Sequence, residues 1–177
     1  MNINPTLYFL RSSEQHIVNT MLTFAFCLDE QNQSAKDFEE LDIYKTFYGL
    51  TRKDLGLYAL VDDQVAGAVW IRNLQDDPYA TLNIAVKPEF RSKGIATAML
   101  NQVFLEAGEI FETICVKIHN EDKIVSFYEK FGFKIEKNLH VKSLISDKNL
   151  IVMIKDLEKK ELNSIYDDYG NCKWMEP

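Results

Sequence analysis

The stretch of residues 82–100, LNIAVKPEFRSKGIATAML, constrains the fold more than any other part of this chain. It begins as a strand, because every second residue from Leu82 onward is apolar. It ends as a helix over 92–107, in which apolar residues recur at intervals of three and four. The turn between them is short, basic and contains Gly94. This pattern predicts a strand, a tight turn and a helix that packs back onto the sheet.

The turn has the properties of an anion-binding site. A helix N-terminus presents backbone N–H groups without internal partners and a partial positive charge. Arg91 and Lys93 add full charges, while Gly94 and the small Ala96 let a bulky ligand approach the backbone. A phosphate or pyrophosphate fits these properties, although a solvated connection with ordinary surface charge fits the residues equally well. The nucleoside-triphosphate motif GxxxxGK[ST] and the dinucleotide motif GxGxxG are both absent.

Composition narrows the class of protein. The chain has 177 residues, of which 46% are hydrophobic and 27% charged, as in a soluble globular domain. The net charge of −7 argues against nucleic acid as a partner. Neither an apolar run of about 20 residues nor a secretory signal is visible, so we expect a cytoplasmic protein without a membrane segment. The three cysteines and three histidines lie apart, so we expect no disulfide framework and no metal site.

The order of the other elements predicts a mixed α+β (or α/β) domain over residues 1–157 and a tail over 158–177 of uncertain structure. A hairpin is expected over 55–72, because two apolar runs flank the turn residues Asp62 and Asp63. The remaining strands are expected at 6–12, 80–86, 113–118, 133–141 and 149–157, and the helices at 13–28, 36–48, 92–107 and 121–131.

Two motifs resemble those of the GCN5-related N-acetyltransferases, the GNAT superfamily. Arg91-x-x-Gly94-x-Ala96 matches the family motif R/Q-x-x-G-x-G/A between a strand and a helix, and the later NEDKIVSFYEKFGF is similar to the second family motif. The resemblance covers roughly residues 6–157. It implies a mostly antiparallel sheet of about seven strands flanked by about four helices. It also implies acetyl-CoA as cosubstrate, whose pyrophosphate is then the anion at the basic turn.

The resemblance assigns residues to the coenzyme A site. Backbone groups of the strand that precedes the turn would line the pantetheine and acetyl groups, and the turn would hold the pyrophosphate. Asn120 would also contact the cofactor, but it lies eight residues before Tyr128, one more than a common family spacing, and a helix cap is the alternative role. The residues so assigned are Ile84, Ala85, Val86, Arg91, Ser92, Lys93, Gly94, Ile95, Ala96, Thr97 and Asn120.

Tyr128 matches the family tyrosine that protonates the departing coenzyme A thiolate, and packing in an aromatic core is its alternative role. A general base is needed because a primary ammonium has a pKa near 10. The candidates are Asp76, Asp77 and His119, and each also fits an ordinary surface turn or strand end.

The resemblance implies transfer of acetyl to a primary amine of a small molecule or peptide by direct attack. The alternative is a non-catalytic module that binds coenzyme A. Many family members are dimers, so the resemblance also allows a homodimer. Acidic residues in 29–42, together with Asp76 and Asp77, would attract a cationic amine if they face the acceptor; a solvated helix face explains them as well.

Overall fold

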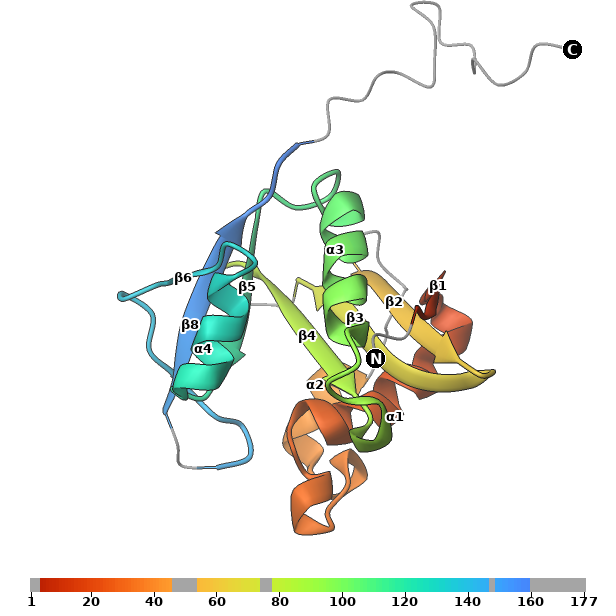
Figure 1. The fold of residues 1–177 in the computed structure, drawn as a ribbon. Coiled ribbons are helices and arrows are strands. Elements are labelled where there is room, and N and C mark those ends of the chain that lie inside the picture. The colour runs from red at the N-terminus through yellow and green to blue at the C-terminus, as the bar shows by residue number, and fades with distance from the viewer. Residues whose placement is uncertain (1–3, 46–53, 74–77, 147–148, 160–177) are drawn as a thin grey trace, which may run out of the picture.

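The computed structural model describes residues 4–45, 54–73, 78–146 and 149–159. Its centre is one sheet with the strand order β1-β2-β3-β4-β5-β8-β6, to which β7 adds by pairing with β8 (Figure 1). The strands are β1 Thr6–Phe9, β2 Asp54–Val61, β3 Gln64–Arg72, β4 Ala80–Val86, β5 Thr113–Ile118, β6 Lys134–Ile135, β7 Val141–Lys142 and β8 Asn149–Asp156. The α-helices are α1 Gln15–Ala25, α2 Asp42–Lys45, α3 Ile95–Ala107 and α4 Asp122–Glu129. The predicted mixed class is confirmed, with one strand more than expected in the described residues.

The sheet is antiparallel except between β4 and β5, and this exception positions the site. The parallel pair is in register only at its start, where Ala80 lies opposite Ile114 and Thr81 opposite Cys115. The side chains of the second pair touch, with Oγ1 of Thr81 3.5 Å from Sγ of Cys115. Beyond this pair the two strands diverge (Figure 1).

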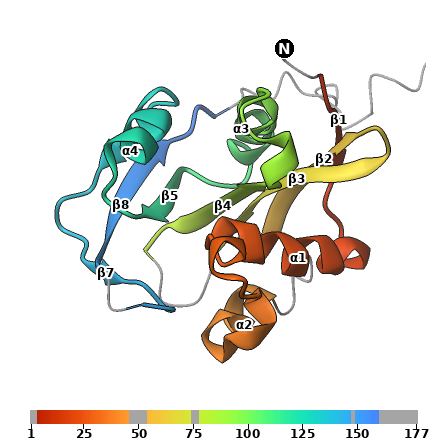
Figure 2. The ribbon, with the colours of Figure 1, turned by 60° about the horizontal axis from the view of Figure 1, so that its bottom comes forward.

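Helices cover both faces of the sheet, as Figure 2 shows, with α3 and α4 on one side and α1 and α2 on the other. The alternation along β4 serves both layers: Leu82 belongs to the core under α3, and Ala85 to the core under α1. Gly67 on β3 allows both α3 and the neighbouring strand β4 to lie close to the β3 backbone. A Cβ atom at Gly67 would lie 2.7 Å from the Ala85 carbonyl oxygen and 3.0 Å from Cε of Met99.

The predicted hairpin is confirmed. Asp62 and Asp63 connect β2 to β3 with φ angles of 49° and 60°. Two consecutive left-handed residues are the geometry of the tight turn that matches the twist of antiparallel strands, and aspartate tolerates it better than most residues.

The predicted helix over 36–48 is wrong in its described part. The chain forms two 3₁₀ turns, Ala35–Asp37 and Glu39–Leu41, and then the single turn of α2. The Asp37 carboxylate accepts a hydrogen bond of 2.8 Å from the N–H of Ser34, and Phe38 is extended at φ −123°. Local bonds from side chain to backbone therefore compete with a continuous helix here. Residues 46–48 lie outside the described residues.

Other boundaries also differ from the expectation. The helix predicted over 13–28 begins as a 3₁₀ turn, Ser12–Glu14, and α1 then ends at Ala25. The strand predicted over 133–141 is reduced to the two short strands β6 and β7. No helix in the described ranges has the length and apolar character needed to cross a membrane.

Candidate active site

The turn from β4 to α3 is shaped as the sequence predicts, with one refinement. The helix begins at Ile95 rather than at 92, and Gly94 holds the N-cap position at φ +83°. Ser92 is also left-handed, at φ 60°. The first helical bond runs from the Ala98 N–H to the Gly94 carbonyl over 3.0 Å. The preceding N–H groups therefore form the open end of a 13-residue helix, where an anion is stabilised.

Both cations of the turn are engaged with the protein. Nε of Arg91 donates to the Val86 carbonyl over 3.1 Å, and the guanidinium lies 3.5 Å from the Asp29 carboxylate and 3.7 Å from that of Glu30. Lys93 donates to a backbone carbonyl at the start of the turn. The 3₁₀ turn after α1, Asp29–Gln31, thus supplies the carboxylates that face the basic turn.

The strand residues assigned to the cofactor lie on the divergent part of β4. Ile84 is opposite Val69, and Val86 is opposite Gly67, so this part of β4 pairs with β3. Among the described residues, no register pair joins it to β5. Backbone groups on its β5 side are therefore available to a ligand, as the resemblance implies. Ile95 is buried in the core, whereas Thr97 is exposed at the start of α3.

A pocket of about 170 Å³ lies where β4 and β5 diverge, and we call it the splay pocket. The end of α1, β4, β5, α4 and the segment before β8 all contribute to it. Much of its lining is apolar. Its side chains that can donate, accept or transfer a proton are Cys27, Asn83, Lys117, His119, Tyr128 and Ser143.

The position of Tyr128 is compatible with both roles that the sequence left open. It is 7% exposed in the core and packs edge-on against Phe127 and Phe133, with ring centroids 5.3 and 5.4 Å away. It also lines the splay pocket. Burial raises the pKa of Tyr128 far above its ordinary value, because the phenolate loses its hydration. The phenol therefore keeps its proton at neutral pH, which leaves its O–H available as a hydrogen-bond donor.

Of the three base candidates, only His119 lies within the described residues. His119 follows β5 directly and lines the splay pocket with Tyr128. Asp76 and Asp77 lie outside the described residues. Asn120 is exposed, and its predicted role as a helix cap is wrong, because Glu121 holds the N-cap position of α4.

Four polar pocket residues were not proposed as site residues from the sequence: Cys27, Asn83, Lys117 and Ser143. Cys27 takes a left-handed conformation at φ 53° just after α1, and no sequence signal indicates this for a cysteine. Asn83 had a signal, because it is a polar residue in the middle of an apolar strand.

The Cys27 thiol is expected to react slowly with alkylating agents. Loss of hydration raises its pKa above 9.0, and the nearby Glu30 carboxylate adds to this effect against the opposing Arg91. Because the thiolate is the reactive form, the alkylation rate should still climb as the pH rises past 9.0. Mass spectrometry of the Cys27 peptide across a pH series measures this, with a Cys27→Ser variant as the blank. A rate that levels off below this pH would contradict the assigned environment.

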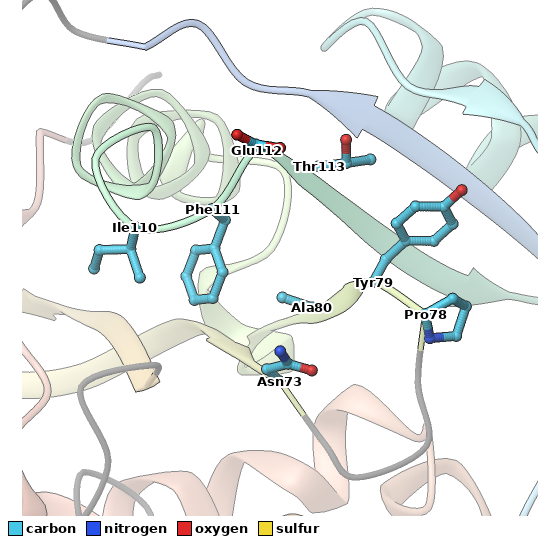
Figure 3. A pocket seen from close by; sticks show the side chains of 8 residues that line it. All are labelled: Asn73, Pro78, Tyr79, Ala80, Ile110, Phe111, Glu112 and Thr113. Atoms are coloured by element: carbon cyan, nitrogen blue, oxygen red, sulfur yellow. The ribbon is translucent and has the colours of Figure 1, made fainter.

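A larger pocket, about 370 Å³, lies at the starts of β4 and β5 (Figure 3). Two of its polar side chains have partners: Glu112 pairs with Lys159 at 2.9 Å, and the Thr113 hydroxyl donates to Asp156 over 2.7 Å. It is at the opposite end of the strands from the divergence, and Tyr128 and His119 are not among its lining residues. Of these two pockets, the splay pocket is therefore the one that Tyr128 and His119 line.

Comparison with known proteins agrees with this geometry. Residues 53–135 match the family model of the acetyltransferase (GNAT) domain. Comparison with curated proteins gives no significant match.

Three solved structures illustrate the shared fold. A GNAT phosphinothricin acetyltransferase from Sinorhizobium meliloti, in complex with AcCoA, is 14% identical with a TM-score of 0.64, covering 92% of this chain and 93% of that chain. A Bacillus subtilis acetyltransferase in complex with CoA is 16% identical with a TM-score of 0.59, covering 88% and 100%. The ribosomal-protein-S18-alanine N-acetyltransferase of Escherichia coli is 18% identical with a TM-score of 0.56, covering 91% and 99%. Such low identities show the fold alone, so this chain has the fold of the GNAT acetyltransferases, and residues 53–135 within it match the acetyltransferase (GNAT) domain.

Proposed function

We propose that this protein transfers an acetyl group from acetyl-CoA to a primary amine of a small molecule or peptide by direct attack. The observation that carries the proposal is the position of Tyr128. It is a buried, protonated phenol in a pocket that opens where β4 and β5 diverge. One of the similar structures is named as an N-acetyltransferase, and two are complexes with CoA or AcCoA, which supports the same chemistry.

The residues present fit coenzyme A. Gly94 at φ +83° leaves the backbone of the turn open to a pyrophosphate, and the N-terminus of α3 supplies N–H donors. Arg91 and Lys93 add positive charge at the rim. When bound, acetyl-CoA supplies an acetyl thioester that an amine can attack.

The residues of the splay pocket supply proton transfer. Tyr128 holds a proton on its phenolic oxygen and can donate it to a departing thiolate. His119 can take a proton from the acceptor ammonium, since neutral imidazole carries one unprotonated ring nitrogen. A divergent strand edge with free backbone N–H groups can polarise a carbonyl without any polar side chain.

Two measurements test the proposal. Calorimetry of the purified protein with coenzyme A should give a dissociation constant between about 1 μM and 1 mM, the usual range for enzyme substrates. A panel of amines with acetyl-CoA should then release free thiol, which needs chemistry as well as binding. Binding without thiol release from any amine would favour the non-catalytic module instead. No binding of coenzyme A even at millimolar concentration would refute both functions.

The contact between Arg91 and Asp29 gives a prediction of its own. Arg91→Ala should weaken coenzyme A binding about tenfold. The variant loses a charge-assisted hydrogen bond to the ligand worth about 1.5–3 kcal/mol, and this loss is partly offset because the weak surface ion pair with Asp29 no longer has to be broken. Asp29→Asn should tighten binding a few-fold, since it removes a carboxylate 3.5 Å from the guanidinium. Calorimetry at low and high salt measures both effects, which salt should reduce.

The matched control is Glu109→Gln, which removes an exposed carboxylate just beyond the far end of α3. It should leave the affinity unchanged. If Asp29→Asn instead weakens binding, the carboxylate orients Arg91 for the ligand rather than competing with it.

A further inference from the structure

The side-chain amide of Asn83 is the feature of the splay pocket that the proposed chemistry does not use. Asn83 lies on β4 beyond the last register pair with β5 and lines the pocket together with Tyr128 and His119. Its Nδ2 atom is buried and has no hydrogen-bond partner among the described residues.

A second buried donor without a described hydrogen-bond partner lies on the neighbouring strand, β3. Trp70 on β3 is the register partner of Asn83, and its Nε1 is also buried without a partner in the described part of the chain. Leaving a buried donor unmet costs about 1–3 kcal/mol, and most buried polar groups are paired. Trp70 is fully buried, whereas Asn83 reaches the pocket. The unmet donors therefore indicate an oxygen that binds at Asn83.

The Asn83 amide is free to present its donor to a ligand. No hydrogen bond among the described residues holds it in one orientation, and the torsion that turns an asparagine amide is broad. A turned amide offers N–H to an oxygen, and its own carbonyl can accept from an N–H. An α-amino carbonyl unit presents this complement, because its oxygen and its amine nitrogen are separated by only two carbon atoms.

The rest of the pocket favours the same group. Lys117 and His119 line it, and none of the described lining residues is a carboxylate. Asp29 and Glu30 face Arg91, and the Asp37 carboxylate caps a backbone N–H. The carboxylates of Glu30, Asp29 and Glu121 act on the Cys27 thiol, which lines the pocket, but none of the three is itself a lining residue. A carbonyl oxygen in the pocket meets the Asn83 donor, whereas a second ammonium group of a polycationic amine meets no carboxylate in the described lining.

Size limits the acceptor further. A pocket of about 170 Å³ is smaller than the roughly 300–1,000 Å³ of sites that hold drug-sized ligands. It suits the amino end of a ligand with a small side chain, and the remainder of a longer ligand would extend outward.

We propose that the acceptor is an α-amino carbonyl compound, either an amino-acid derivative or a peptide N-terminus, and that the Asn83 amide binds its carbonyl oxygen. This inference rests on the proposed function and names the substrate class of the same site. Asn83 is thereby a specificity-determining residue. It positions the amine beside His119 and Tyr128.

Matched acceptors test this directly. Thiol release at saturating acetyl-CoA should have a kcat/KM for alaninamide about tenfold or more above that for isopropylamine, which has the same branched amine without the carbonyl. Putrescine should be poorer than alaninamide as well. Asn83→Leu should raise the KM for alaninamide about tenfold with a smaller change in kcat, and should abolish the preference over isopropylamine.

Two further variants keep the test decisive. Asn83→Asp has nearly the same shape, so it covers the case in which the leucine variant does not fold. It should disfavour alanine, with its free carboxylate, relative to alaninamide more than the wild type does. The control Asn101→Leu makes the same change at an exposed amide on α3 and should leave the acceptor preference as it is.

A binding measurement separates this inference from the proposed function. Alaninamide is titrated by calorimetry into protein saturated with coenzyme A, where no acetyl transfer can occur. Binding that Asn83→Leu removes supports the inference even if no amine releases thiol, and in that case only the proposed transfer fails. If isopropylamine or putrescine is the best acceptor and Asn83→Leu alters neither the KM nor the acceptor preference, the proposed acetyl transfer stands but the inference about the substrate class is overturned. The Asn83 amide would then hydrogen-bond only to a buried water molecule. Absence of alaninamide binding and turnover overturns the inference too.

Discussion

Replacing Tyr128 with phenylalanine is expected to lower the turnover number about 100- to 10,000-fold, the usual contribution of a general acid. The ring and its edge-on packing against Phe127 and Phe133 are kept, so the fold should be little affected. What is lost is the proton on the phenolic oxygen, which the departing thiolate needs. Coenzyme A affinity, measured by calorimetry, should stay near that of the wild type, so that the loss falls on kcat.

The control for this experiment is Tyr58→Phe, the same substitution on β2, where the ring stacks on Tyr8 with centroids 5.5 Å apart. Its turnover should match that of the wild type. Since burial raises the pKa of Tyr128 above 10.0, the wild-type rate should not fall as the pH rises from about 8 to 10. Unchanged turnover in Tyr128→Phe would limit Tyr128 to the packing role.

Gly94→Val is expected to weaken coenzyme A binding by about 10- to 100-fold. A β-branched residue at φ +83° is strained by about 1–3 kcal/mol, and its side-chain carbons stand where the ligand should approach the turn. The turn can relieve this strain only by moving the N–H groups at the start of α3. Calorimetry measures the affinity, and a thermal melt shows that the variant remains folded.

Gly132→Val provides a matched control for backbone strain. Gly132 has nearly the same φ, +82°, just after α4, and a Cβ there would meet only the flexible end of Lys155 at 3.2 Å. This variant should lose a similar amount of stability without losing coenzyme A affinity. Normal binding by Gly94→Val would show that the start of α3 is not the pyrophosphate site.

The elements that local residues determine were predictable. The turn between β4 and α3 follows from an alternating strand, a glycine and a helical repeat, all within residues 80–107. The hairpin turn at Asp62 and Asp63 is equally local. The helix predicted over 36–48 failed for the opposite reason, since its apolar spacing was helical but the Asp37 carboxylate bonds to a neighbouring backbone N–H.

The sequence by itself therefore determined the mixed fold class, the glycine-containing turn into α3 and the choice of Tyr128 as a candidate site residue. Only the tertiary structure decided what surrounds them. Arg91 meets Asp29, 62 residues away along the chain, and Asn83 and Tyr128 share a pocket although they come from a strand and a distant helix. Periodicity reports which face of an element is apolar, but partners across the sheet depend on where β4 and β5 part and on how α1 lies over them. Contacts of that kind arise from packing of distant segments, and no local pattern encodes them.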